Sequence, residues 1–362
     1  MPNLHVFSDN SSFVNGAADF IAGLADQAIT ERGRVTIALS GGNTPRQIYA
    51  RLATAGNRII NALTGEGVLM RGVNRSGMEY SEPDEEGFLT TAGITHAEMR
   101  WISREWQANI VRIPFNQDWA LNGRRAHEAE VYLRNLDRIV SLASRYRMYT
   151  LLDLQWLDAD HPFGANRQFV PPLPNPDTPR LWATLARRYR DEPAVLFDIL
   201  NEPHDRQPDD PFPLWRPDAT QYPDSQRRVG MEEWQPWARL LVDTISGEHP
   251  DALIFVSGIN WGYDLRGFPL DRLNLVYSTH VYSNKGGNWD AAFGDLSRAY
   301  PVFAGEWGGN EDEVEWGRRL SGYFDERGMG WTAWSWSDQP YLVGRYVPTG
   351  FGSVVKDAMN VS

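Results

Sequence analysis

From Asn57 onward, hydrophobic residues gather in short runs that are separated by stretches with helical periodicity, such as Val131–Arg145 and Glu313–Arg327. Most runs are continuously apolar, as is typical of strands covered on both faces. The predicted strands are Val68–Val73, Ile110–Ile113, Thr150–Leu154, Val195–Leu200, Ala252–Val256, Leu275–Thr279, Val302–Ala304 and Trp331–Trp334. Such alternation over about 300 residues predicts an α/β fold, a (β/α)₈ TIM barrel over residues 57–362.

Residues 1–56 have a different pattern, which predicts a short α-β-α fragment before the barrel. An amphipathic helix precedes the strand Val35–Leu39, and a turn then leads into a second helix that begins at Pro45. One strand and two helices are too few to close a core, and the strand would leave unpaired edges. We therefore expect this fragment to dock on the barrel or to form the contact of a homodimer.

Composition narrows the classes of partner. The formal net charge is −12, so an acidic surface disfavours nucleic acid and anionic membranes and suits an uncharged substrate. The chain has no cysteine, which excludes disulfides and zinc–thiolate sites. No stretch is apolar for long enough to span a bilayer, and residues 1–12 lack the pattern of a signal peptide. Without an export signal, a cytoplasmic location is the default expectation.

Two glutamates follow predicted strands in short, unusual contexts. Glu202 lies in Asn201-Glu202-Pro203 after the fourth strand, and Glu306 lies in Gly305-Glu306-Trp307 after the seventh. Cleavage of a glycosidic bond needs an acid for the leaving oxygen and a second group at the anomeric carbon. Side chains from these two strands can converge at the barrel mouth. One such glutamate alone would read as a surface turn, but the two together predict a catalytic pair.

The neighbouring polar residues fit this reading. Asn201 can hold a sugar 2-hydroxyl, while Tyr282 can donate to Glu306 and His280 can bond Glu202, since both leave the sixth strand on one side. A buried Arg112 needs a carboxylate partner, for which Glu306 is the nearest candidate. A core histidine and a structural ion pair are the alternatives.

Tryptophans stand at several strand ends, where stacking on sugar rings is an alternative to core packing. Trp334 is the strongest candidate for a platform under a sugar. The others are Trp119, Trp156, Trp261 and Trp336.

Together these motifs resemble glycoside hydrolase family 5, the cellulase family of clan A, over about Asn57 to Asp338. The resemblance rests on Arg71–Glu79, Val111–Pro114, Asn201–Pro203, His280–Tyr282, Gly305–Trp307 and Trp334, in this order. It implies Glu202 as acid/base, Glu306 as nucleophile, and Arg112, Asn201, His280, Tyr282 and Trp334 as subsite contacts. It also places a hairpin that plugs the barrel floor at Arg58–Gly67.

Two features depart from that family. Gln155 stands where relatives usually have histidine, so altered substrate placement is expected, and Glu82–Gly93 is unlike the cellulases.

Separately, residues 4–55 resemble the N-terminus of 6-phosphogluconolactonase through Leu39–Pro45 and the helix Gln47–Ala53. The rest of that enzyme's motifs are missing, which favours a fused fragment.

The sequence thus predicts a retaining endo-β-1,4-glucanase that needs no cofactor or metal. The alternatives are the same chemistry on mannan, xyloglucan, β-1,3-glucan or a glycolipid, a non-catalytic carbohydrate-binding barrel suggested by Gln155, and a sugar-phosphate enzyme built on the N-terminal turn. Relatives in this family are usually secreted, which conflicts with the missing export signal.

Overall fold

The computed structural model describes residues 51–80, 93–123, 127–157, 172–206 and 228–359. Within them, parallel strands close into a barrel in the order β10-β3-β4-β5-β6-β7-β8-β9. These strands are β3 (Arg71–Asn74), β4 (Ile110–Asn116), β5 (Tyr149–Trp156), β6 (Val195–Asp198), β7 (Ile254–Ser257), β8 (Leu275–Val281), β9 (Val302–Trp307) and β10 (Gly330–Ala333). Each overlaps one of the predicted runs, so the predicted TIM barrel is confirmed.

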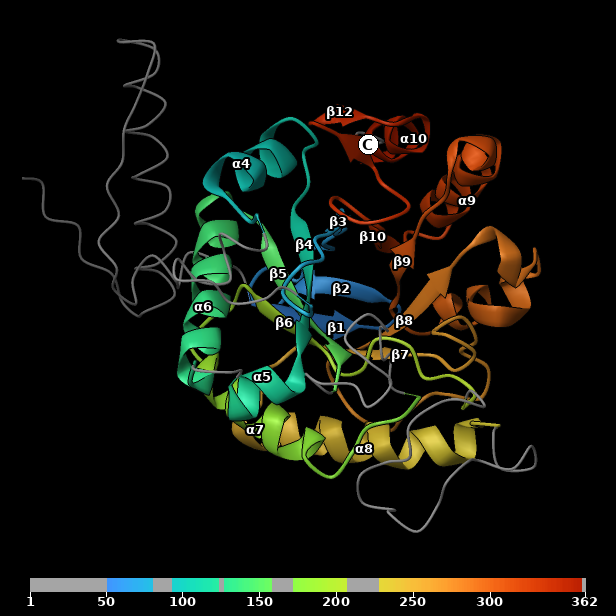
Figure 1. Cartoon of the computed structure of the whole chain (residues 1–362). Helices are drawn as coiled ribbons and strands as arrows, with labels where there is room; N and C mark the ends of the chain where they lie inside the picture. The colour runs from blue at the N-terminus through green and yellow to red at the C-terminus, as the bar shows by residue number, and fades with distance from the viewer. Residues whose placement is uncertain (1–50, 81–92, 124–126, 158–171, 207–227, 360–362) are drawn as a thin grey trace, which may run out of the picture.

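Helices surround the barrel (Figure 1). They are α4 (His96–Arg104), α5 (Gln117–Asn122), α6 (Ala129–Arg145), α7 (Thr178–Arg188), α8 (Met231–Glu248), α9 (Val314–Glu326) and α10 (Gly350–Met359). The apolar face predicted for α6 is buried, including Leu136 and Ile139. The acidic run before α9 is a helix start, as predicted, because Asn310 and Glu313 form a capping box at the short turn η5 (Glu311–Glu313).

Smaller elements complete the chain. Between β8 and β9 lie three short helical turns, η2 (Ser283–Lys285), η3 (Asp290–Gly294) and η4 (Leu296–Arg298), and after β10 comes a two-stranded hairpin, β11 (Val343–Gly344) and β12 (Val347–Pro348). No helix in the described ranges is both long and apolar enough to cross a membrane.

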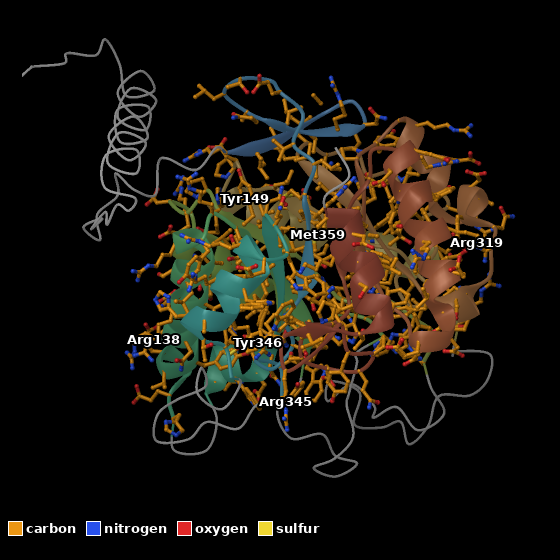
Figure 2. The ribbon with its side chains drawn as sticks, turned by 90° about the horizontal axis from the view of Figure 1, so that it is seen from above. Arg138, Tyr149, Arg319, Arg345, Tyr346 and Met359 are labelled. Carbon is orange, nitrogen blue, oxygen red and sulfur yellow. The ribbon has the colours of Figure 1, made fainter. Side chains whose placement is uncertain are left out.

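A hairpin closes the floor of the barrel. It consists of β1 (Leu52–Ala55) and β2 (Arg58–Asn61), and Figure 2 shows it at one end of the barrel, opposite Arg345 and Tyr346. Leu52 and Ile59 pack there in a cluster with the first buried residues of the barrel strands. This cluster is Leu52, Ile59, Met70, Ile110, Leu151, Leu196, Leu253, Phe255, Val276 and Phe303.

The hairpin corrects one prediction and shifts another. The helix expected to continue to Ala53 is wrong, because Leu52–Ala55 is a strand that pairs with β2 and buries Leu52 in the floor. The plug expected over Arg58–Gly67 begins earlier, at Leu52, and reaches Gly67 through one bridge to Ile60. The boundary predicted between residues 56 and 57 falls in the turn of this hairpin.

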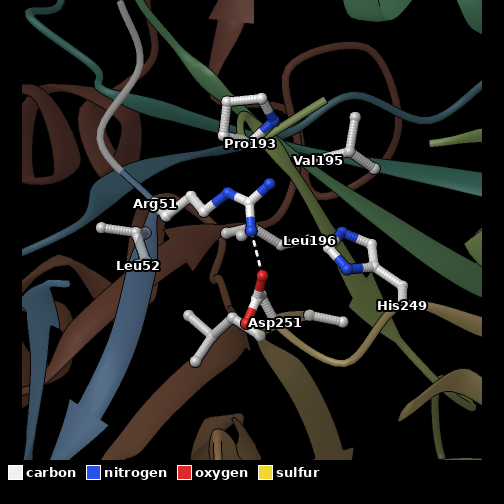
Figure 3. Close-up of a pocket in the computed structure, with 9 residues that line it drawn as sticks. Arg51, Leu52, Pro193, Val195, Leu196, His249 and Asp251 are labelled. Atoms are coloured by element: carbon white, nitrogen blue, oxygen red, sulfur yellow. Dashed lines mark hydrogen bonds and ion pairs between the residues drawn. The ribbon is translucent and has the colours of Figure 1, made fainter. Parts of the chain in front are cut away.

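A small cavity lies at the floor beside β1 (Figure 3). Its lining includes the ion pair between Arg51 and Asp251, together with Val195, Leu253 and the buried His249. Val195 begins β6, and Leu253 immediately precedes β7. The cavity is therefore at the opposite end of the strands from Glu202 and is not the candidate site.

Several predicted features lie outside the described residues. They include the strand Val35–Leu39, the turn before Pro45, nearly all of Glu82–Gly93, and much of the loops that follow β5 and β6.

Candidate active site

The two predicted glutamates meet at the carboxyl end of the barrel. Glu202 follows β6, and Glu306 lies near the end of β9. A carboxylate oxygen of each and a ring nitrogen of His280 all lie within 4.8 Å of one another. This approach matches retaining glycosidases, whose carboxyl groups are about 5–5.5 Å apart, better than inverting ones, where about 6.5–9.5 Å leaves room for water.

A bulge in β9 aims Glu306 at this point. The register of β8 against β9 shifts after Thr279, so that His280 pairs with Glu306 and Gly305 is the extra residue. A Cβ on Gly305 would lie 2.4 Å from the Ser278 hydroxyl and 2.8 Å from His280 Nε2, which only glycine avoids. The bulge thus lets His280 pack closely while Glu306 turns into the mouth.

The surroundings of Glu202 favour its protonated form. His280 Nδ1 lies 2.9 Å from Glu202 Oε1, as predicted. Burial raises the pKa of Glu202 to about 7, and the charges of Lys285 and Arg112 restrain that rise. Burial also lowers the pKa of His280 to about 3, so its ring is neutral beside the acid. Glu202 can therefore hold a proton near neutral pH, as a general acid must.

Glu306 is held instead by donors. The Tyr282 hydroxyl donates to Oε2 at 2.8 Å, as predicted, and Arg112 Nη1 donates to Oε1 at 3.0 Å. Burial, with the charges of Glu306 and Glu202, raises the pKa of Tyr282 well above its ordinary value, so the hydroxyl keeps its proton. A carboxylate with an arginine and a hydroxyl donor is stabilised as an anion, the form that a nucleophile requires.

Arg112 connects these residues from inside the barrel. It is fully buried, so the expectation that it touches the substrate is not met; it acts through the side chains that it holds. The guanidinium reaches five side-chain oxygens at 2.9–3.0 Å. They belong to Asn74, Asp153, Asp198, Asn201 and Glu306.

Sequence reasoning found one of Arg112's acidic partners and missed the other two. Glu306 was predicted, whereas Asp153 and Asp198 lie inside the predicted strands Thr150–Leu154 and Val195–Leu200. A charged residue inside an apolar strand is a signal that could have found them, just as it found Arg112. Oδ1 of Asn201 accepts a hydrogen bond from Arg112 Nη2 at 2.9 Å, which leaves the amide nitrogen of Asn201 for other partners.

The predicted aromatic contacts divide into two groups. Trp156, Trp261 and Trp334 keep part of their surface exposed. Trp261 also stacks on His204, with ring centroids 3.6 Å apart. The prediction for Trp119 is wrong, because this side chain is 1% exposed and packs edge-on against Tyr132 in the core.

Trp336 is likewise a core residue, packed against Trp106. The strand-end position alone therefore did not separate groove tryptophans from core tryptophans.

Gln155, where the family resemblance expects histidine, leaves β5 at the mouth. It is 8% exposed, and its side-chain oxygen has no hydrogen-bond partner among the described residues.

By spacing alone, the trio of Glu202, His280 and Glu306 could also hold a metal ion.

Buried acids should make the fold less stable in alkali. Burial raises the pKa of Glu79 to about 8 and that of Glu202 to about 7, so the folded chain keeps protons that the unfolded chain has lost. Unfolding free energy should fall by about 2–3 kcal/mol from these two groups between pH 6.5 and 8.5. The lowered pKa values of His204 and His280 act in the opposite direction, but only below about pH 6.5.

Denaturant titrations at several pH values measure this slope. Glu79→Gln should flatten it, because it removes the group with the higher pKa. A wild-type stability that stays level or rises over this interval would contradict the account.

Comparisons with known proteins agree with both resemblances. The model of the cellulase family, glycosyl hydrolase family 5, matches residues 64–340, and the model of glucosamine-6-phosphate isomerases and 6-phosphogluconolactonases matches residues 8–64. The end of the second match overlaps the floor hairpin.

Curated relatives include endoglucanase N of Pectobacterium atrosepticum, 22% identical over 311 residues, and endoglucanase E-5 of Thermobifida fusca, 20% identical over 318 residues. Each alignment covers 82% of this chain but only 59% and 58% of the relative. The chain therefore spans about three fifths of the length of these relatives.

Among solved structures, a β-glucanase of Saccharophagus degradans superposes with a TM-score of 0.68 at 21% identity, covering 90% of this chain and 97% of that one. The same enzyme in complex with cellotetraose gives a TM-score of 0.69. These likenesses agree with the barrel fold, and the family model covers most of the chain. The chain belongs to the cellulase family, glycosyl hydrolase family 5.

Proposed function

We propose that this chain is a retaining endo-β-1,4-glucanase. The observation that carries the proposal is the approach of Glu202 and Glu306 to within 4.8 Å, each in surroundings suited to a different protonation state. The endoglucanase relatives and the neighbour that binds cellotetraose support a β-glucan as the substrate class.

The chemistry proceeds in two balanced steps. Glu306 attacks the anomeric carbon while Glu202 gives its proton to the departing glycosidic oxygen, so one C–O bond breaks and a glycosyl ester forms. Glu202, now ionised, then takes a proton from water, and the water oxygen attacks the same carbon and releases Glu306. Each displacement inverts the centre, so the product keeps its configuration.

The neighbouring side chains have distinct parts in this scheme. Tyr282 and Arg112 hold Glu306 in place as an anion, and His280 orients Glu202. Asn201 presents its amide nitrogen for the sugar 2-hydroxyl. Trp334, Trp261 and Trp156 offer partly exposed aromatic faces for glucose rings. None of these steps calls for a cofactor.

Defined oligosaccharides test the substrate class. Incubation with cellohexaose and mannohexaose, followed by chromatography, should show internal cleavage of the first and little of the second. Faster cleavage of the mannan oligomer would overturn the β-1,4-glucan assignment and favour another β-glycan. Altered substrate placement by Gln155 would then be one reason for that preference. Binding of cellohexaose without any product would instead indicate a non-catalytic carbohydrate-binding barrel.

A further inference from the structure

Three carboxyl groups surround one guanidinium inside the barrel mouth. Arg112 Nε donates to Asp198 at 2.9 Å, Nη1 donates to Glu306 at 3.0 Å, and Nη2 lies 2.9 Å from Oδ1 of Asp153. The four side chains are between 0% and 6% exposed. If all three acids were ionised, the cluster would carry two uncompensated negative charges away from water, which is strongly unfavourable. At least one of the three acids is therefore expected to hold a proton.

The hydrogen bonds indicate which acid that is. Glu306 accepts from both Tyr282 and Arg112, and Asp198 accepts from Arg112 and lies 3.5 Å from the Ser257 hydroxyl. Neither oxygen of Asp153 accepts a hydrogen bond from any described residue, because the close Nη2 contact is not aligned as one. A buried carboxylate without donors is the costliest of the three to ionise.

A second buried side-chain oxygen without a hydrogen-bond donor in the described part of the chain belongs to Gln155, on the same strand β5 as Asp153. Gln155 follows Asp153 by two residues and is the extra residue where the register of β4 against β5 shifts, between the pairs Phe115–Leu154 and Asn116–Trp156. The side-chain oxygen of Gln155 is buried and also lacks a donor among the described residues. One proton between two acceptor groups would satisfy both of them.

We propose that Asp153 is a neutral carboxylic acid in the resting protein and that its hydroxyl donates to the side-chain oxygen of Gln155. The cluster then carries one net negative charge, from Asp198 and Glu306 against Arg112. Under the proposed function, esterification of Glu306 removes that charge, and Arg112 and Asp198 balance each other in the covalent intermediate. Asp153 is thus a positioning residue that turns the Gln155 amide nitrogen away from itself, toward the sugar.

The electrostatic surroundings agree with this assignment. Burial raises the pKa of Asp153 well above its ordinary value, and the charges of Asp198, Glu306 and Glu79 raise it further. Arg112 is the cation that opposes this rise. These groups face Asp153 from β4, β6, β9 and the segment after β3.

Isotope-edited infrared spectroscopy tests the proton directly in the wild-type chain. With ¹³C at the aspartate side-chain carboxyl, a protonated aspartate gives a carbonyl band distinct from ionised aspartates and from the unlabelled Glu79 and Glu202. We expect one such band to persist at pH 8. Its absence would overturn the proposal whether or not the chain hydrolyses glucans.

Matched variants assign the band. Asp153→Asn should remove it, because Asp153 carries the proton in the proposed state. Loss of the band in Asp198→Asn but not in Asp153→Asn would place the proton on the wrong residue and overturn the proposal.

The pH profile of kcat/KM distinguishes a charged from a neutral Asp153. A loss of stability alone would not shift the acid limb of this profile. Asp198→Asn removes a negative charge near Glu306 and should shift the acid limb to lower pH by about one unit. Asp153→Asn replaces a neutral group by a neutral group and should leave that limb in place, whatever its kcat. Equal shifts in both variants would mean that Asp153 is ionised.

Discussion

Glu306→Gln should lower kcat on a soluble β-glucan by roughly 10⁴- to 10⁶-fold, as removal of a nucleophile does in other enzymes that form covalent intermediates. An amide has nearly the same shape as the carboxylate, but it cannot form the ester on which the proposed pathway depends. Arg112 keeps its ion pair with Asp198, so we expect the fold to survive. Rates of reducing-sugar release from purified proteins measure the effect.

A matched control separates chemistry from stability. Glu315 lies in α9 with its side chain 89% exposed, so Glu315→Gln removes one carboxylate without touching the barrel mouth. The control should keep wild-type rates, and both variants should keep the wild-type melting temperature. A Glu306→Gln protein with near wild-type turnover would refute its assignment as nucleophile.

Glu202→Ala should affect substrates according to their leaving groups. On cello-oligosaccharides, loss of the general acid should cost about 10²- to 10⁴-fold. On 2,4-dinitrophenyl β-cellobioside the first step should be nearly unaffected, because dinitrophenolate departs without a proton. Release of the second product should then be slow, since no base activates water.

Azide provides the complementary observation for this variant. As a small anion it needs no deprotonation, so it should restore turnover of Glu202→Ala and give a β-cellobiosyl azide. Equal losses on both substrates, with no response to azide, would show that Glu202 is not the acid/base.

The barrel was predictable because each strand carries its own signal. A run such as Ala252–Val256 is apolar throughout, and the helices between the runs have clear periodicity, so element order alone indicates the fold. The two candidate catalytic glutamates were recognisable for a related reason, since barrel strands present their carboxyl ends at one face.

The sequence alone did not reveal how deeply a side chain is buried or which residues it contacts. Trp119 and Trp261 both follow strands, yet Trp119 is buried against Tyr132 and Trp261 stays partly exposed. That difference depends on helix α5 turning Trp119 inward, which no local pattern reveals.

The floor hairpin was misplaced for a similar reason. Leu52 and Ala53 suit a helix locally, but tertiary pairing with β2 and burial in the barrel floor override that preference.

The acidic partners of Arg112 also could not be predicted from the local sequence. Asp153 and Asp198 look like ordinary interruptions of apolar strands until the closed barrel brings them to one guanidinium. Their meeting depends on the register across β4, β5 and β6, where Arg112 pairs with Leu151 and Asp153 pairs with Asp198. The electrostatics of the site is therefore a property of the closed barrel.

The stereochemistry of the first product reports whether one carboxylate is close enough to attack the anomeric carbon while the other protonates the leaving group. Proton NMR of a freshly started reaction with cellotetraose resolves the two anomers before they equilibrate. Because the oxygens of Glu202 and Glu306 approach within 4.8 Å, we expect the β-anomer to appear first. Initial release of the α-anomer would mean a single displacement by water and would contradict the proposed two-step mechanism.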